Sequence, residues 1–325
     1  MKLSAYSSIA AVIVLLIALP WFSSSNVVIS FMIYTLIIAI AAQGWNVLGG
    51  MAGQISFGHA AFFGTGAYVI SLWQLNLGFG AWSGLLVGIA AGALVGWLVG
   101  FLSFRAGLRG SYFALVTLAF AEVFRVLTNA SPLMGGASGL LLPINYGFEH
   151  LQFSNRKYFY WLTVAVLSVG LIVVRKISFS RFGAQLAAVR ENEDAAKALG
   201  INVLKVKLKA ITLSGGLAAA AGCLYVQYFL YIDASLAFGP KVSVEVLLAS
   251  MVGGLGTVFG PLVGVLGLHL LGEAVKSFTG EIPGVDMAIY GGVLIVAVCF
   301  LPQGLLGLGR KWRIRSAKTE QEQRT

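Results

Sequence analysis

Formal charge is scarce in this sequence of 325 residues. Only 10% of the residues are charged and 58% are hydrophobic, whereas an average soluble domain carries about 25% charged residues. Residues 3–104 contain no Lys, Arg, Asp or Glu. Because about 20 apolar residues cross a bilayer as a helix, this stretch predicts several membrane spans. The composition excludes a water-soluble enzyme and a disordered chain.

Motifs for nucleotide and metal chemistry are also missing. No glycine is followed directly by lysine, so the chain has no G-x-x-x-x-G-K-[ST] phosphate loop. The three histidines (His59, His150 and His269) lack the spacing of a metal site. Cys223 and Cys299 lie in apolar runs and suggest packing residues, not a disulfide framework. We expect no cofactor, no metal and no enzymatic activity, so any energy source has to be another polypeptide or a gradient.

Apolar segments can be separated at turn residues, which predicts an all-α polytopic membrane protein of about ten transmembrane helices. The segments span roughly residues 7–22, 27–48, 54–73, 82–104, 110–128, 159–176, 208–230, 242–257, 260–279 and 286–308. Residues 7–22 lack a small-x-small cleavage site at their end and are interpreted as a retained helix. We expect a transmembrane domain over residues 1–309 and a basic tail over 310–325.

Positive charge is concentrated in two places. Residues 175–209 carry eight basic and three acidic groups, and residues 310–325 carry six basic and two acidic groups. Basic loops lie on the cytoplasmic side of a membrane, so these clusters favour a membrane protein over nucleic-acid binding. With ten spans, both termini and the loop 177–207 are expected in the cytoplasm, and the loop 129–158 outside.

Two glycine-rich stretches interrupt the apolar segments, one from residue 49 to 68 and one from 253 to 264. Glycine and proline weaken a helix, and backbone groups freed inside a membrane need protein or water partners. Paired interruptions of this kind indicate a transport site, although close helix packing explains them as well. The candidate pathway residues are Gly53, Ser56, Gly58, His59, Gly253, Gly254 and Gly256.

Four polar residues lie within the apolar segments. His59 either hydrogen-bonds the interrupted backbone or touches solute, whereas His269 is expected to be a hydrogen-bonded core residue. Glu122 and Arg125 are one helical turn apart and close enough to pair. Because charges at that depth face protein or water, they form either an outer polar contact for solute or a structural pair, and the structural pair is favoured.

Three stretches carry a family resemblance: residues 46–50 with 53–64, residues 117–122 with Arg125 and 135–140, and residues 180–183 with 190–200. Over about residues 30–308 the chain resembles the branched-chain amino acid ABC transporter permeases of the LivM type. The resemblance implies a subunit of an importer in the bacterial cytoplasmic membrane. Its implied partners are a second permease in a heterodimer, two ABC ATPase subunits and an extracytoplasmic solute-binding protein.

The loop 177–207 is predicted to contain the coupling helix that docks the ATPase in such importers. Leu186, Val189, Ala196 and Leu199 share one helical face over residues 184–199, and Gly200 occupies the position that follows a helix end. Asp194 begins a pattern similar to the importers' EAA motif, with Asp for Glu and without the closing Leu-Pro. A helix lying on the membrane surface is the alternative. The candidate docking residues are Arg190, Glu191, Asp194, Ala195, Ala196, Leu199 and Gly200.

Three functions therefore compete. The favoured one is a permease subunit of an ATP-driven importer for branched-chain or related hydrophobic amino acids, with urea or short amides as alternative substrates, because those permeases share the motifs. A gradient-driven secondary transporter would place a titratable carboxylate near the membrane midplane, and residues 3–104 offer none. An intramembrane enzyme would need a triad, a metal set or clustered acids, which the sequence lacks.

Overall fold

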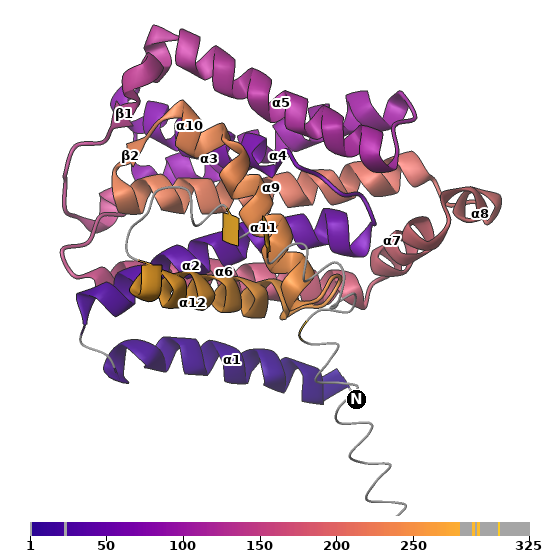
Figure 1. Cartoon of the computed structure of the whole chain (residues 1–325), viewed down its shortest axis with the longest axis horizontal. Helices are drawn as coiled ribbons and strands as arrows, with labels where there is room; N and C mark the ends of the chain where they lie inside the picture. The colour runs from indigo at the N-terminus through magenta and orange to yellow at the C-terminus, as the bar shows by residue number, and fades with distance from the viewer. Residues whose placement is uncertain (1, 23–24, 280–287, 290, 293–304, 306–325) are drawn as a thin grey trace, which may run out of the picture.

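The computed structural model describes residues 2–22, 25–279, 288–289, 291–292 and 305. The described part is predominantly helical (Figure 1). Six of its helices are long and apolar enough to cross a membrane, and two shorter apolar helices lie at Ser7–Phe22 and Gly260–Ala274. Most of the tenth expected span, Cys299 and the basic tail lie outside the described residues.

The helix boundaries follow the expected segments closely. The α-helices are α1 Lys2–Phe22, α2 Asn26–Trp45, α3 His59–Leu75, α4 Ala81–Arg105, α5 Gly110–Ala130, α6 Arg156–Ser178, α7 Arg181–Glu191, α8 Glu193–Ala198, α9 Val203–Phe229, α10 Ala234–Phe238, α11 Pro240–Gly253 and α12 Gly260–Thr279. The short elements are the π-helix η1 Asn46–Met51, the 3-10 helices η2 Pro132–Met134, η3 Gly136–Ser138 and η4 Phe148–His150, and the strands β1 Leu140–Leu141 and β2 Tyr231–Ile232.

Glycine allows the central helices to approach closely. Helix α9 packs against α2, α3 and α4, while α1 and α5 lie at opposite edges of the bundle (Figure 1). A Cβ atom on Gly96 of α4 would lie 2.7 Å from the carbonyl oxygen of Ile211, and one on Gly88 would lie 2.5 Å from Cys223 Sγ. Small residues at helix contacts are the usual solution in lipid, where close packing supplies much of the association energy.

One detail departs from the all-α prediction. Strands β1 and β2 form an antiparallel pair that joins Leu140 to Ile232 and Leu141 to Tyr231. The pair ties the long α5–α6 connection to the end of α9. It lies at the end of the bundle opposite α7 and α8 (Figure 1). We call the end that carries residues 105–109, α7, α8 and the first turn of α9 the basic end.

Candidate functional site

Both predicted interruptions are present. Helix α2 passes into the π-helix η1, and the chain is irregular from residue 52 to 58 before α3 begins at His59. Helix α11 ends at Gly253, and α12 begins at Gly260 after a second irregular segment, 254–259. We call residues 46–58 the first break and residues 254–259 the second break. π-Helical turns are rare and are found frequently at functional sites.

The two breaks contact each other directly. The Asn46 side chain donates from Nδ2 to the Thr257 carbonyl oxygen (2.9 Å) and accepts at Oδ1 from the Gly256 N–H (2.7 Å). Gln43 Nε2 donates to the Val258 carbonyl oxygen at 2.8 Å. The side-chain amides of Gln43 and Asn46 thus form hydrogen bonds with backbone groups of the second break that have no helical partners. Backbone groups inside a membrane need such partners, because lipid offers none. Neither Asn46 nor Gln43 was among the candidates from sequence.

Close packing accounts for part of the glycine pattern. A Cβ atom on Gly58 would overlap the Thr117 carbonyl oxygen, and one on Gly253 would overlap the Gly260 carbonyl oxygen. Both glycines are buried, as are Ser56 and Gly254. Gly53 and Gly256 are exposed and half-buried respectively, and their positive φ angles (70° and 71°), like that of Gly254 (129°), favour glycine. Whether these seven residues line a solute route stays a prediction.

His59 fastens the first break to α9. Its Nδ1 lies 3.1 Å from Ser56 Oγ, and its Nε2 lies 2.7 Å from Ser214 Oγ. The ring is buried, with 1% of its surface exposed, and Trp45 Nε1 donates to the Ser56 carbonyl oxygen. In this conformation His59 bonds neighbouring hydroxyls and so contributes to the structure of the break. Its contact with solute stays a prediction.

The predicted coupling helix is two helices, which corrects the single helix expected over residues 184–199. The chain turns at Asn192, whose extended backbone (φ −159°) ends α7 and whose side chain accepts hydrogen bonds from the N–H groups of Asp194 and Ala195. Asn is a preferred N-cap residue, a signal that the sequence contained. Leu186, Val189 and Ala196 of the predicted apolar face are buried within this chain, but Leu199 is 80% exposed because α8 ends before it. Gly200 has a φ of +81°, as expected after a helix end.

Arg190 connects this loop to both breaks. Its Nη1 donates to the Gly50 carbonyl oxygen at 3.1 Å. Its side chain covers Gly53, where a Cβ atom would lie 2.6 Å from Arg190 Cγ, and its Nη1 lies near Gly256, where a Cβ atom would come within 3.4 Å. Two sets of residues predicted separately, the pathway glycines and the docking loop, therefore meet at one side chain.

Glu193 is a second connection, which sequence reasoning missed. Its carboxylate pairs with Arg109 Nε at 3.1 Å and with the buried Lys207 ammonium of α9, and it lies 3.4 Å from Gln54 Nε2 of the first break. Next to it, Arg109 and Lys197 hold the pKa of the exposed Asp194 carboxyl below its usual value, and Asp194 in turn raises the pKa of Arg109. A carboxyl group whose pKa is lower in the folded than in the unfolded protein stabilises the fold above its unfolded-state pKa. This stabilisation is lost as the pH falls through the folded-state pKa.

The face of α5 that carries Glu122 and Arg125 is uncovered by the described residues of this chain. The two side chains form the predicted pair, with Arg125 Nη2 2.5 Å from Glu122 Oε1 and 31% and 52% of the side chains exposed. Large apolar residues of α5 are exposed as well, among them Leu115, Leu118 and Val126. Charged groups at membrane depth require protein or water around them, so lipid tails alone do not suit this face.

A buried carboxylate joins three helices elsewhere in the bundle. Glu245 of α11 lies 2.7 Å from His269 Nε2 of α12 and accepts a hydrogen bond from the Tyr34 hydroxyl of α2. His269 Nδ1 lies 2.8 Å from Thr35 Oγ1. His269 is thus the hydrogen-bonded core residue that the sequence indicated, and its acidic partner was not anticipated.

The fold and these contacts define a polytopic membrane protein with paired helix breaks joined to a basic loop. The chain belongs to the family described as the branched-chain amino acid transport system permease component, whose model matches residues 27–298. It is 30% identical, over 96% of its length and 78% of the relative's, to the high-affinity branched-chain amino acid transport system permease protein LivM of Escherichia coli (strain K12). It is 24% identical to LivH of the same organism, over 83% of this chain and 91% of LivH. The LivM-type resemblance is confirmed.

Proposed function

We propose that this chain is the LivM-type permease subunit of an ATP-driven importer of branched-chain or related hydrophobic amino acids. In this proposal it forms the route across the bacterial cytoplasmic membrane together with a second permease. Two ABC ATPases hydrolyse ATP in the cytoplasm, and an external solute-binding protein delivers the amino acid. Family membership and the transport functions of the LivM and LivH relatives support this proposal. Ten spans, with both termini in the cytoplasm, are part of it.

The observation that carries the mechanism is the contact of Arg190 with both breaks. An ATPase bound to α8 would move α7, and Arg190 would transmit that movement to the Gly50 carbonyl and to the second break. Glu193 would move Gln54 in the same direction. A zwitterion crossing lipid needs hydrogen bonds that apolar side chains cannot give. Backbone amides released when the breaks separate would supply them, and the N-terminal end of α3 or α12 favours a carboxylate.

The α5 face is the proposed contact with the second permease. Glu122 and Arg125 are exposed there beside apolar side chains, a combination that suits a protein partner or the water-filled route between two subunits. LivM and LivH both resemble this chain, which favours a heterodimer. This placement also accounts for the exposure of the pair among the residues that the structure describes.

Replacing Arg190 by alanine tests the proposed coupling. We expect Arg190→Ala to leave assembly with the ATPases intact but to lower leucine uptake into ATP-loaded proteoliposomes on the order of tenfold, because the loop then moves without the breaks. Stimulation of ATP hydrolysis by the loaded binding protein should fall as well. Arg181→Ala, which removes the same charge from the first turn of α7, is the matched control. Normal uptake by Arg190→Ala would contradict this mechanism.

Two further conditions separate the alternatives. Competition of leucine uptake by isoleucine, valine, urea and acetamide identifies the solute class, and we expect only the amino acids to compete. A protonophore should leave uptake unchanged when ATP is supplied. The second condition matters because Glu245 and His269 form a buried titratable pair, the kind of feature that a proton-coupled transporter uses. Loss of uptake with the protonophore would favour that class instead.

A further inference from the structure

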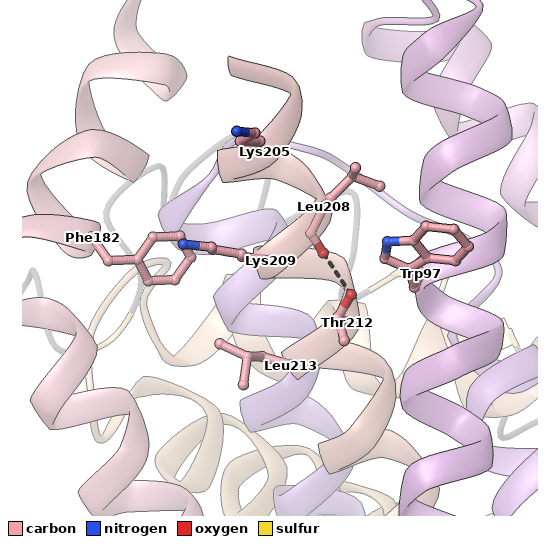
Figure 2. Close-up of a pocket in the computed structure, with 7 residues that line it drawn as sticks. All are labelled: Trp97, Phe182, Lys205, Leu208, Lys209, Thr212 and Leu213. Atoms are coloured by element: carbon pink, nitrogen blue, oxygen red, sulfur yellow. Dashed lines mark hydrogen bonds between the residues drawn. The ribbon is translucent and has the colours of Figure 1, made fainter. Parts of the chain in front are cut away.

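A cavity of about 640 Å³ lies between α4, α7 and α9 near the basic end. Its lining is mostly apolar. The residues around it are Trp97, Phe182, Lys205, Leu208, Lys209, Thr212 and Leu213. Figure 2 shows Lys205 at one end and Leu213 at the other, with Phe182 and Trp97 on the two sides. The eight residue steps from Lys205 to Leu213 correspond to about 12 Å along a helix, which is comparable to one half of a bilayer's apolar core.

The charges around this cavity are unbalanced. Lys205 and Lys209 are exposed, and neither ammonium has an ion-pair partner within the described part of the chain. The three acidic groups of the neighbouring loop are occupied elsewhere: Glu191 pairs with Arg190, Asp194 with Arg109 and Lys197, and Glu193 with Arg109 and Lys207. An anion placed beside the two lysines would therefore meet no competing carboxylate.

Lys205 lies at one end of the cavity and Lys209 beside Phe182 near its middle, while Leu208, Trp97 and Leu213 supply apolar lining (Figure 2). The Thr212 hydroxyl donates a hydrogen bond to the Leu208 carbonyl oxygen at 2.7 Å (Figure 2). It therefore does not need a hydrogen-bond acceptor from a molecule bound in the cavity. Trp97 is 40% exposed, and its indole nitrogen lies on the side toward Leu208 and Thr212 (Figure 2). Tryptophan is enriched where headgroups meet acyl chains.

We propose that this cavity, the α4–α9 groove, binds an anionic phospholipid. Its phosphate lies between the Lys205 and Lys209 ammonium groups, and an acyl chain runs past Leu208, Trp97 and Leu213. A transmembrane helix of a second subunit would fill the apolar part but would leave two lysine charges unmatched. An anionic phospholipid satisfies both parts, and juxtamembrane lysines are attracted to anionic lipid. The inference stands on this groove alone and does not depend on which solute the importer carries.

Quenching of Trp97 fluorescence by brominated lipids tests the site. The full-length chain is reconstituted in phosphatidylcholine vesicles that contain either brominated phosphatidylglycerol or brominated phosphatidylcholine, and the Trp97 signal is the difference between wild type and Trp97→Phe. We expect half-quenching at a mole fraction of brominated phosphatidylglycerol on the order of tenfold lower than of brominated phosphatidylcholine, since each lysine attracts anionic lipid. Lys205→Gln/Lys209→Gln should remove this preference while quenching by brominated phosphatidylcholine persists.

The control removes two charges from the same end of the molecule without touching the groove. Arg105→Ala/Lys176→Ala should keep the preference, because neither residue lines the cavity. The proposal is overturned if the wild type shows no preference, if the preference survives in Lys205→Gln/Lys209→Gln, or if both double variants lose it equally. It is also overturned if neither brominated lipid quenches Trp97 in a complex with the second permease, because a protein then covers the groove.

Discussion

Single side chains hold the two breaks in place, and each does so by completing hydrogen bonds that an interrupted helix leaves open. Asn46 serves the second break with both its amide nitrogen and its amide oxygen. Arg190 serves the first break at the Gly50 carbonyl. Gly58 contributes by having no side chain, because α3 begins against the Thr117 carbonyl of α5. Specific hydrogen bonds and close packing therefore stabilise both breaks, and low helix propensity alone does not account for them.

Gly58→Ala measures the packing at the residue scale. Its φ of −107° suits any residue, so the only effect of the added methyl group is overlap with the Thr117 carbonyl. Overpacking of this kind costs about 1–3 kcal/mol, and we expect a lower thermal unfolding temperature in detergent. Gly80→Ala is the matched control, because its methyl group would meet only Glu149 at an ordinary 3.7 Å. Equal melting temperatures for Gly58→Ala and wild type would show that packing does not require this glycine.

Helices α7 and α8 act as an element with one side against the bundle and the other outside it. Ala196 is buried with Leu186 and Val189 in the same hydrophobic cluster, while Asp194, Ala195, Leu199 and Gly200 are exposed. The exposed side chains of Ala195 and Leu199 form a small apolar projection at the end of α8 that can insert into a groove on a partner. If an ATPase docks on α8, as proposed, the surface open to it is the one around Ala195 and Leu199, not the one around Ala196.

Two substitutions on α8 separate docking from folding. Leu199→Asp should leave the amount of inserted protein unchanged, because that side chain is 80% exposed, but should abolish co-purification with the ATPases. Ala196→Asp should lower the amount of folded permease instead, since an unpaired carboxylate would be buried. Blue-native electrophoresis and ATPase co-purification measure the two effects. Undiminished ATPase binding by Leu199→Asp would remove this surface as the dock.

The whole molecule has a polar asymmetry along its bundle axis. The basic end carries α7, α8 and the first turn of α9, and the α5–α6 connection with the β1–β2 pair lies at the other end (Figure 1). The segment 175–209 has a net charge of +5, whereas residues 129–158 contain only Glu149, Arg156 and Lys157 as charged groups. Positive loops are hard to translocate, so the proposed orientation puts the basic end in the cytoplasm.

Cysteine labelling tests this orientation. In a variant without Cys223 and Cys299, new cysteines are placed at Ser138 and Ala195, both of which are exposed. An impermeant thiol reagent should label position 138 on intact cells and position 195 only after permeabilisation. A third cysteine at Ser316, outside the described residues, reports on the tail and should behave like position 195. Labelling of position 195 on intact cells would refute the orientation and the ATPase dock with it.

The sequence by itself determined the class of protein, the helical segments among the described residues and the place of both breaks. Hydrophobicity, scarce charge and clustered glycine are properties of consecutive residues, so they can be recognised in the sequence without knowledge of tertiary contacts. Only the tertiary structure decided which distant groups meet: Asn46 with Gly256, Arg190 with Gly50, Glu193 with Lys207, and Glu245 with His269. It also divided the expected coupling helix at Asn192 and turned Leu199 outward. Such pairings depend on how helices far apart in sequence pack against one another, and no periodicity within one segment records that.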